Sequence, residues 1–80
     1  MKVLKFSADW CTPCHTLAKT LESMNLNVEI ESIDIDEEPS RVSKFAIRGV
    51  PTMILVDDNG KELSRSVGAM TPTEILEWLE

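Results

Sequence analysis

Residues 3–15 of this chain, VLKFSADWCTPCH, decide its fold. The apolar run from Val3 to Ala8 is typical of a strand. Two cysteines, Cys11 and Cys14, follow it directly and open a segment with helical periodicity. A strand that leads through Cys-x-x-Cys into an amphipathic helix indicates a βαβ unit with a reactive turn at its first junction.

The helix and the next strand complete that βαβ unit. Apolar side chains recur at helical spacing between residues 12 and 24, which predicts an amphipathic helix there. Residues 28–35 alternate in character and predict a second strand, parallel to the first because a helix joins them. The alternation slips at Glu31 and Ser32, which predicts a bulge or a change of buried face.

The second half of the chain predicts a short helix and then a hairpin. The helix opens after Asp36, has Pro39 in its first turn and runs to about Ala46. Strands are predicted at residues 52–56 and 62–67, on either side of an Asp-Asp-Asn-Gly turn. The second of these strands is polar, as expected of an exposed edge.

The end of the chain predicts a third helix. Thr71–Glu74 forms a capping pattern, and we expect Ile75, Leu76 and Leu79 to form the buried face that follows. The resulting order is βαβαββα. It predicts one α/β domain over residues 1–80, with a four-stranded mixed sheet flanked by helices on both faces.

The composition limits the possible functions. Of the 80 residues, 42% are hydrophobic and 28% charged, as in a globular domain. The net charge is −6, which argues against a nucleic-acid partner. The longest apolar run, Met53 to Val56, is too short to cross a membrane. No apolar signal segment follows Met1, so we expect a cytoplasmic location unless a leader was removed before Met1. We also expect a monomer without a membrane partner.

The cysteine pair is better explained by chemistry than by stabilisation of the fold. A bridge between Cys11 and Cys14 closes so small a loop that it removes little entropy from the unfolded chain. Zinc would need a fourth ligand beside Cys11, Cys14 and His15, and the adjacent residues 14 and 15 do not easily converge on one ion. We therefore expect no metal, unless two chains share one.

The start of a helix favours redox chemistry at this pair. With Cys11 at the cap and Cys14 in the first turn, the two Cα atoms come within the disulfide range of roughly 4.4–6.8 Å. Free backbone N–H groups and the helix dipole favour the thiolate form of Cys11. Pro13 restricts the conformations of the turn. Trp10 offers a flat apolar surface to a partner protein. The predicted chemistry is thiol–disulfide exchange, in which Cys11 attacks a substrate disulfide and Cys14 then releases the reduced substrate.

The run WCTPC from Trp10 to Cys14 resembles the active site of thioredoxins, with Thr12 where the common form has glycine. The resemblance covers essentially the whole chain. A full-length thioredoxin has another strand and helix ahead of the position of Val3, so this chain resembles a shortened thioredoxin with a glutaredoxin-sized core. The other segments that are similar to thioredoxins, in the right order, are Ile33–Asp36, Ile47–Thr52, Asp58–Gly60 and Val67–Ala69.

The resemblance implies a role for each matching residue. Cys11 would be the exposed nucleophile, and Cys14 would be the buried resolving thiol. Pro51 would be a cis proline facing the disulfide, and the backbone of Val50 would hydrogen-bond an extended substrate. The apolar docking surface would consist of Trp10, Thr12, Pro13, Val50, Gly68 and Ala69.

The activity implied by the resemblance is that of a thioredoxin-like protein disulfide reductase. Its dithiol would reduce disulfides in client proteins and would need no tightly bound cofactor, because both electrons reside on the two sulfurs. Thioredoxin reductase would supply the electrons, and ribonucleotide reductase would be one client.

Two positions depart from the thioredoxin pattern. Lys5 stands where thioredoxins usually bury an aspartate, and Ser32 replaces the lysine near it, so that proton relay does not carry over. The Lys5 ammonium either favours thiolates and makes the pair more oxidising, or reaches solvent and has no chemical role. His15, where thioredoxins often have lysine, either tunes the acidity of the thiols or is an ordinary solvent-facing residue.

Two other functions remain open from the sequence. A glutaredoxin-like thiol transferase that uses glutathione is favoured by the short chain, whereas WCTPC and residues 47–52 favour a thioredoxin. A non-catalytic subunit would use the same fold to bind a partner through Trp10 and Val50. The electron donor separates the first alternative from the main interpretation, and substitution of Cys14 tests the second.

Overall fold

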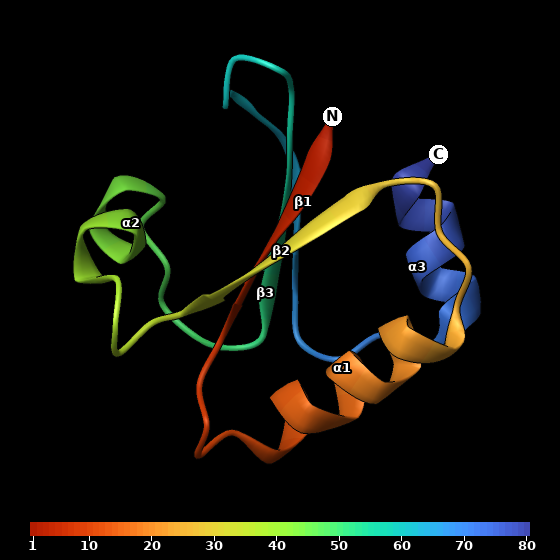
Figure 1. Cartoon of the computed structure of the whole chain (residues 1–80), viewed down its shortest axis with the longest axis horizontal. Coiled ribbons are helices and arrows are strands. Elements are labelled where there is room, and N and C mark those ends of the chain that lie inside the picture. The colour runs from red at the N-terminus through yellow and green to blue at the C-terminus, as the bar shows by residue number, and fades with distance from the viewer.

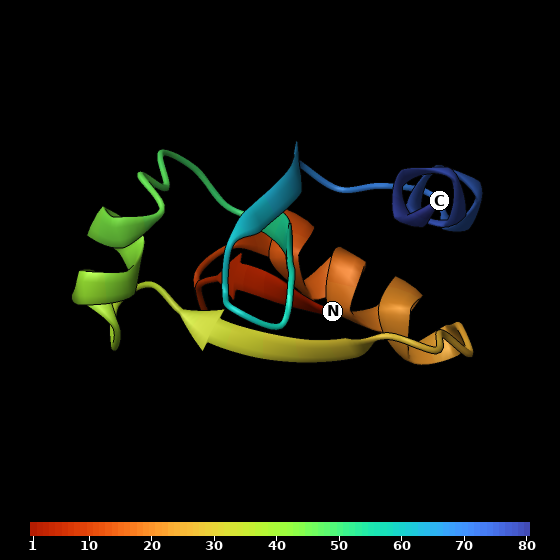
Figure 2. The same ribbon diagram turned by 90° about the horizontal axis from the view of Figure 1, so that it is seen from above.

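The computed structural model describes residues 1–80 and places two helices on one face of a four-stranded sheet and one helix on the other (Figures 1 and 2). The elements follow one another in the predicted order, and their limits lie within about two residues of those expected. They are β1 (Lys2–Ser7), α1 (Thr12–Ser23), β2 (Glu29–Asp34), α2 (Pro39–Lys44), β3 (Thr52–Val56), β4 (Glu62–Val67) and α3 (Pro72–Leu79).

The sheet has the strand order β2-β1-β3-β4. β1 pairs in parallel with β2 and antiparallel with β3, and β4 pairs antiparallel with β3 as the predicted polar edge. Because β1 and β2 are parallel, the segments that follow their carboxyl ends lie at the same edge of the sheet. Figure 1 shows β1 running from the N-terminus to that edge, where the loop before α1 begins.

Alternate residues of the central strands form a core on each face of the sheet. β3 is buried along its whole length, as expected of an interior strand with helices on both sides. α2 and its following residue Phe45 cover one face, whereas α1 and α3 cover the other (Figure 2). The core on the α1 and α3 side contains Val3, Leu17, Leu21, Met53, Leu55 and Ile75, and the core on the α2 side contains Leu4, Phe6, Ile33, Phe45, Ile54 and Val56.

The phase slip in β2 is a change of buried face. Ile30 packs on the side of α1 and α3, whereas Ile33 lies in the core beneath α2. The pairing of β2 with β1 runs without interruption through Glu31 and Ser32, so the alternative of a bulge there is wrong. The irregular pairing in this sheet lies between β3 and β4, at Leu55 and Val56.

The third helix packs through two of the three residues expected, Ile75 and Leu79. Its capping box is present, since the Thr71 side chain accepts from the Glu74 amide and the Glu74 side chain accepts from the Thr71 amide. Ile75 is buried, but Leu76 is 53% exposed, so its prediction as a core residue is wrong. At helical spacing the positions that share the face of Ile75 are Trp78 and Leu79, which pack against the core.

None of the three helices is both long enough and apolar enough to serve as a membrane span.

Candidate active site

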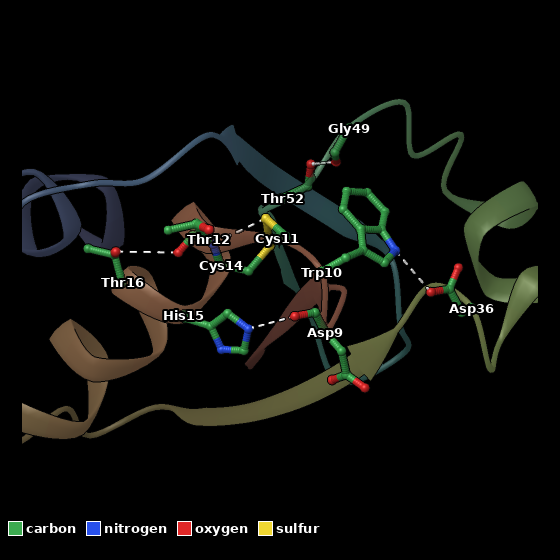
Figure 3. The surroundings of a disulfide bond; sticks show 10 residues. All are labelled: Asp9, Trp10, Cys11, Thr12, Cys14, His15, Thr16, Asp36, Gly49 and Thr52. Atoms are coloured by element: carbon green, nitrogen blue, oxygen red, sulfur yellow. Dashed lines mark hydrogen bonds between the residues drawn. A yellow bond between two sulfur atoms is a disulfide. The ribbon is translucent and has the colours of Figure 1, made fainter.

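Cys11 and Cys14 form a disulfide at the start of α1, as shown in Figure 3. Cys11 is the N-cap of the helix and has extended backbone angles. The backbone N–H of Cys14 donates to the Cys11 sulfur at 3.2 Å. The two Cα atoms lie 5.2 Å apart, within the range that a disulfide needs. Pro13 fits in the first turn because an N–H at that position has no partner within the helix.

The resemblance implied an exposed Cys11 beside a buried Cys14, and for this oxidised form that expectation is wrong. Cys11 is 5% exposed and Cys14 is 4% exposed. Both cysteines pack with Ala8, and half-buried Ile35 and Val50 lie against the same cluster. The bond to Cys14 holds Cys11 within this apolar cluster, which explains why the two cysteines are almost equally buried.

Trp10 lies at the surface beside the disulfide. Its side chain is 68% exposed, which agrees with a docking residue and not with a core tryptophan. The indole Nε1–H donates to Asp36 Oδ2 at 3.1 Å, and Figure 3 shows the ring extending toward that carboxylate. The sequence prediction did not include Asp36 in the site. Its place after β2 was the available signal, since β2 ends at the same edge of the sheet as β1.

The loop between α2 and β3 packs against the disulfide. The Val50–Pro51 peptide bond is cis, Pro51 is buried, and Val50 contacts the cysteine cluster. The Thr52 hydroxyl donates to the Gly49 carbonyl at 2.7 Å, an interaction that the sequence did not reveal. This loop therefore lies next to the sulfurs, as the resemblance implied.

The segment after β4 lies against the same loop. The Gly68 N–H donates to the Pro51 carbonyl at 2.8 Å. Gly68 has a φ of +95°, a conformation that side-chain-bearing residues rarely adopt. Gly68 is half-buried, and Ala69 beyond it is exposed. The hydrogen bond continues the antiparallel pairing of β3 with β4, in which Thr52 lies opposite Val67, and so places the start of this segment at the proline loop.

Lys5 occupies an interior position of β1. It pairs with Ser32 and Met53 and is 9% exposed. No side-chain nitrogen or oxygen of the protein is completely buried without a hydrogen-bond partner, and Lys5 forms no side-chain hydrogen bond, so its ammonium nitrogen is not completely enclosed. The side chain is therefore largely buried with its nitrogen open to solvent, which agrees with the interpretation of a lysine that extends to solvent.

His15 and the exposed residues of the first turn surround the disulfide. Thr12 and Pro13 are exposed on the first turn of α1. His15 is exposed as well, and its Nε2 lies 2.7 Å from the Asp9 carbonyl oxygen. The imidazole thus contacts the backbone ahead of Cys11, a contact that an ordinary solvent-facing helix residue would lack.

No group of three or more His, Cys, Asp or Glu side chains is arranged to hold a metal ion. The candidate ligands Cys11 and Cys14 are bonded to each other, and His15 is directed to a carbonyl oxygen. The chemistry that this arrangement supports is exchange at the two sulfurs.

Comparison with known proteins agrees with this geometry. The chain is 37% identical over 79 residues to the thioredoxin of Rhodospirillum rubrum, which covers 94% of this chain and 75% of that protein. It is 36% identical over 80 residues to the SPbeta prophage-derived thioredoxin-like protein YosR of Bacillus subtilis, covering 100% of this chain and 96% of that one.

Solved structures show the same similarity. Thioredoxin 1 of Thermosipho africanus has a TM-score of 0.84 at 27% identity, covering 99% of this chain and 90% of that chain. A mutant thioredoxin of Halobacterium salinarum has a TM-score of 0.85 at 31% identity, and the match covers 94% of this chain and 67% of that chain. The thioredoxin family model matches residues 1–80. With a match over every residue, the chain belongs to the thioredoxin family, whose members are protein thiol–disulfide oxidoreductases.

Proposed function

We propose that this protein reduces disulfide bonds in client proteins, with Cys11 as the nucleophile and Cys14 as the resolving thiol. The observation that carries the proposal is the N-cap position of Cys11, where the Cys14 N–H is directed at the Cys11 sulfur. This hydrogen bond and the positive end of the helix dipole stabilise a negative charge on that sulfur. Cys14 lies inside the helix and lacks this environment.

The reaction takes two exchange steps. The Cys11 thiolate attacks one sulfur of the client disulfide, forms a mixed disulfide, and expels the other client sulfur, which takes up a proton. Cys14 then loses its proton and attacks the Cys11 sulfur, which breaks the mixed disulfide and releases the second client thiol. The client gains two electrons and two protons, and the protein is left with the Cys11–Cys14 disulfide. The second step is intramolecular, because the two Cα atoms are only 5.2 Å apart.

Client binding is assigned to the surface around the sulfurs. Trp10 supplies an exposed aromatic face, and Val50 packs against the cysteine cluster with a backbone that forms none of the loop hydrogen bonds and is free for an extended client segment. Neither contact requires a particular client side chain, so the surface suits many clients. The proposed contact residues are Trp10, Thr12, Pro13, Val50, Pro51, Gly68 and Ala69.

Return to the dithiol requires an external electron donor. Two sulfurs hold both electrons of the cycle, so the mechanism needs no bound cofactor. We assign the role of donor to thioredoxin reductase and include ribonucleotide reductase among the clients. The protein would act as a monomeric domain of residues 1–80 in cytoplasmic electron transport and redox homeostasis.

The test is reduction of insulin disulfides with one of two donors. We expect rapid turnover with thioredoxin reductase and NADPH, and slow turnover with glutathione and glutathione reductase. Turnover with glutathione alone would instead assign the protein to glutathione-dependent thiol transfer. Absence of turnover with both donors, for a chain whose disulfide is reduced by dithiothreitol, would refute the proposed activity.

A further inference from the structure

The His15 side chain links the first turn of α1 to the loop that precedes Cys11. Its Nε2 lies 2.7 Å from the Asp9 carbonyl oxygen. Because a carbonyl oxygen only accepts hydrogen bonds, Nε2 carries the proton and donates it. Figure 3 shows the imidazole directed from the helix back toward Asp9. The backbone N–H of the same residue donates to the Cys11 carbonyl at 3.3 Å.

This hydrogen bond and the disulfide join the same two segments. The disulfide connects Cys11 to Cys14, and the His15–Asp9 hydrogen bond connects the residues just outside that pair. When the disulfide is reduced its covalent constraint disappears, whereas the side-chain hydrogen bond to the backbone carbonyl can still form, at a greater entropic cost because the S–S bond no longer holds the two segments together. The loop would then still be fastened to α1 next to the two thiols.

The loop is also fastened at its other side, so the His15 contact acts on a short and otherwise anchored segment. The Cys11 N–H donates to the Ala8 carbonyl at 3.2 Å, and the Trp10 indole donates to Asp36. The Asp9 carbonyl is the point at which this loop accepts a hydrogen bond from a side chain of α1. Loss of the His15 contact would therefore free the loop on the helix side alone.

We propose that His15 is a positioning residue of the redox turn, whose hydrogen bond to the Asp9 carbonyl keeps the Cys11 and Cys14 thiols within bonding reach in the reduced protein. Closing a disulfide costs less conformational entropy when its two ends are already held together. The hydrogen bond therefore shifts the dithiol–disulfide equilibrium toward the disulfide and makes the dithiol a stronger reductant. The inference rests on the proposed function only for its biological use. The dithiol–disulfide equilibrium is a property of the redox turn, and it is measured without a client.

The experiment measures that equilibrium in glutathione buffers, where the protein disulfide and two glutathione molecules exchange with the protein dithiol and one glutathione disulfide. His15→Phe keeps a flat ring and removes the donor. His15→Gln keeps an N–H donor of similar reach and cannot carry a charge. Thr20→Val is the matched control, since it removes a hydroxyl-to-carbonyl hydrogen bond from α1 away from the turn.

We expect the His15→Phe disulfide to be less stable against glutathione by about three- to tenfold, the range of one hydrogen bond of ordinary strength. His15→Gln and Thr20→Val should stay within about twofold of the unmodified protein. Because His15 is exposed, its substitutions remove no core packing.

Two results would overturn the inference. One is a His15→Phe equilibrium within about twofold of the unmodified protein. The other is an equal loss in His15→Gln, which would assign the effect to the ring or its charge and not to the hydrogen bond. Failure of the unmodified protein to reduce insulin would refute the proposed function and leave this comparison intact, because no client takes part in it.

Discussion

In the proposed mechanism Cys11 and Cys14 act in different steps of the exchange, so their substitutions should fail in different ways. In Cys14→Ser the nucleophile and its helix cap remain, and the protein should form a mixed disulfide with the client that it cannot resolve. In Cys11→Ser no mixed disulfide should form. We expect insulin turnover to fall by roughly a hundredfold or more in both, because the intramolecular second step is lost or never reached.

Mass spectrometry under non-reducing conditions distinguishes the two cysteine variants. A covalent adduct with the client should accumulate in Cys14→Ser and be missing in Cys11→Ser. If Cys14→Ser instead keeps the full biological activity of the protein, the fold serves as a binding subunit and electron transfer is not its role.

Lys5 lies in the interior of β1 with a nitrogen that is not completely enclosed, and this predicts a small effect on the redox pair. Lys5→Met keeps the apolar stem and removes the ammonium. We expect the dithiol–disulfide equilibrium against glutathione to change by less than about twofold, as in the control Lys19→Met on the exposed side of α1. A disulfide made about tenfold more stable by Lys5→Met would contradict this result and show that the ammonium stabilises the thiolates.

The sequence predicted the reactive residues better than their surroundings. Cys11, Cys14 and Trp10 form a local motif, and the structure places them side by side at the helix start. Asp36 lies 26 residues from Trp10 in the chain, and its hydrogen bond depends on the pairing of β1 with β2. The burial of Cys11 depends on Val50, another distant residue. Contacts of this kind follow from the tertiary fold, which a local pattern does not specify.

At the scale of single elements, the capping box of α3 gives a prediction about stability. Thr71→Ala removes the side chain that accepts from the Glu74 amide. We expect a loss of about 1 kcal/mol in the free energy of unfolding, the usual value for an N-cap threonine. Chemical denaturation of the oxidised protein measures it. Thr73→Ala, an exposed site in the same turn, should cost much less, and equal losses in the two variants would contradict a capping role.

The elements themselves were predictable because their signals are local. The interior strand Thr52–Val56 and the start of α3 at Pro72 agree with the sequence prediction, since an apolar run and a capping pattern mark them. Leu76 was assigned to the core wrongly, because the orientation of an eight-residue helix is set by its packing on the sheet and not by its own composition. The change of buried face in β2 was one of two alternatives until the pairing with β1 was known.

At the scale of the whole molecule, Glu31 connects three elements. Its carboxylate on β2 accepts from Lys2 of β1 at 2.8 Å and from Arg41 of α2 at 2.5 Å. These hydrogen bonds, that of Arg41 first, lower the pKa of Glu31 from 4.5 to about 2. The Arg41 guanidinium also pairs with Glu38. A domain of this size buries a modest share of its surface, so a link between two strands and a helix matters to its stability.

The lowered pKa of Glu31 predicts a loss of stability in acid. A carboxyl group whose pKa is lower in the folded state stabilises the fold above its unfolded pKa of 4.5, and this contribution disappears as the pH falls toward about 2. We expect about 1 kcal/mol, because the carboxylate is one-third exposed and water screens the pair. Urea denaturation of the oxidised protein across this pH range should show a stability difference between the unmodified chain and Glu31→Gln that is present near neutral pH and vanishes in strong acid. Glu29→Gln, an exposed neighbour without an ion pair, is the control, and a difference that persists unchanged at the acid end would show that Glu31 acts through packing and not through its charge.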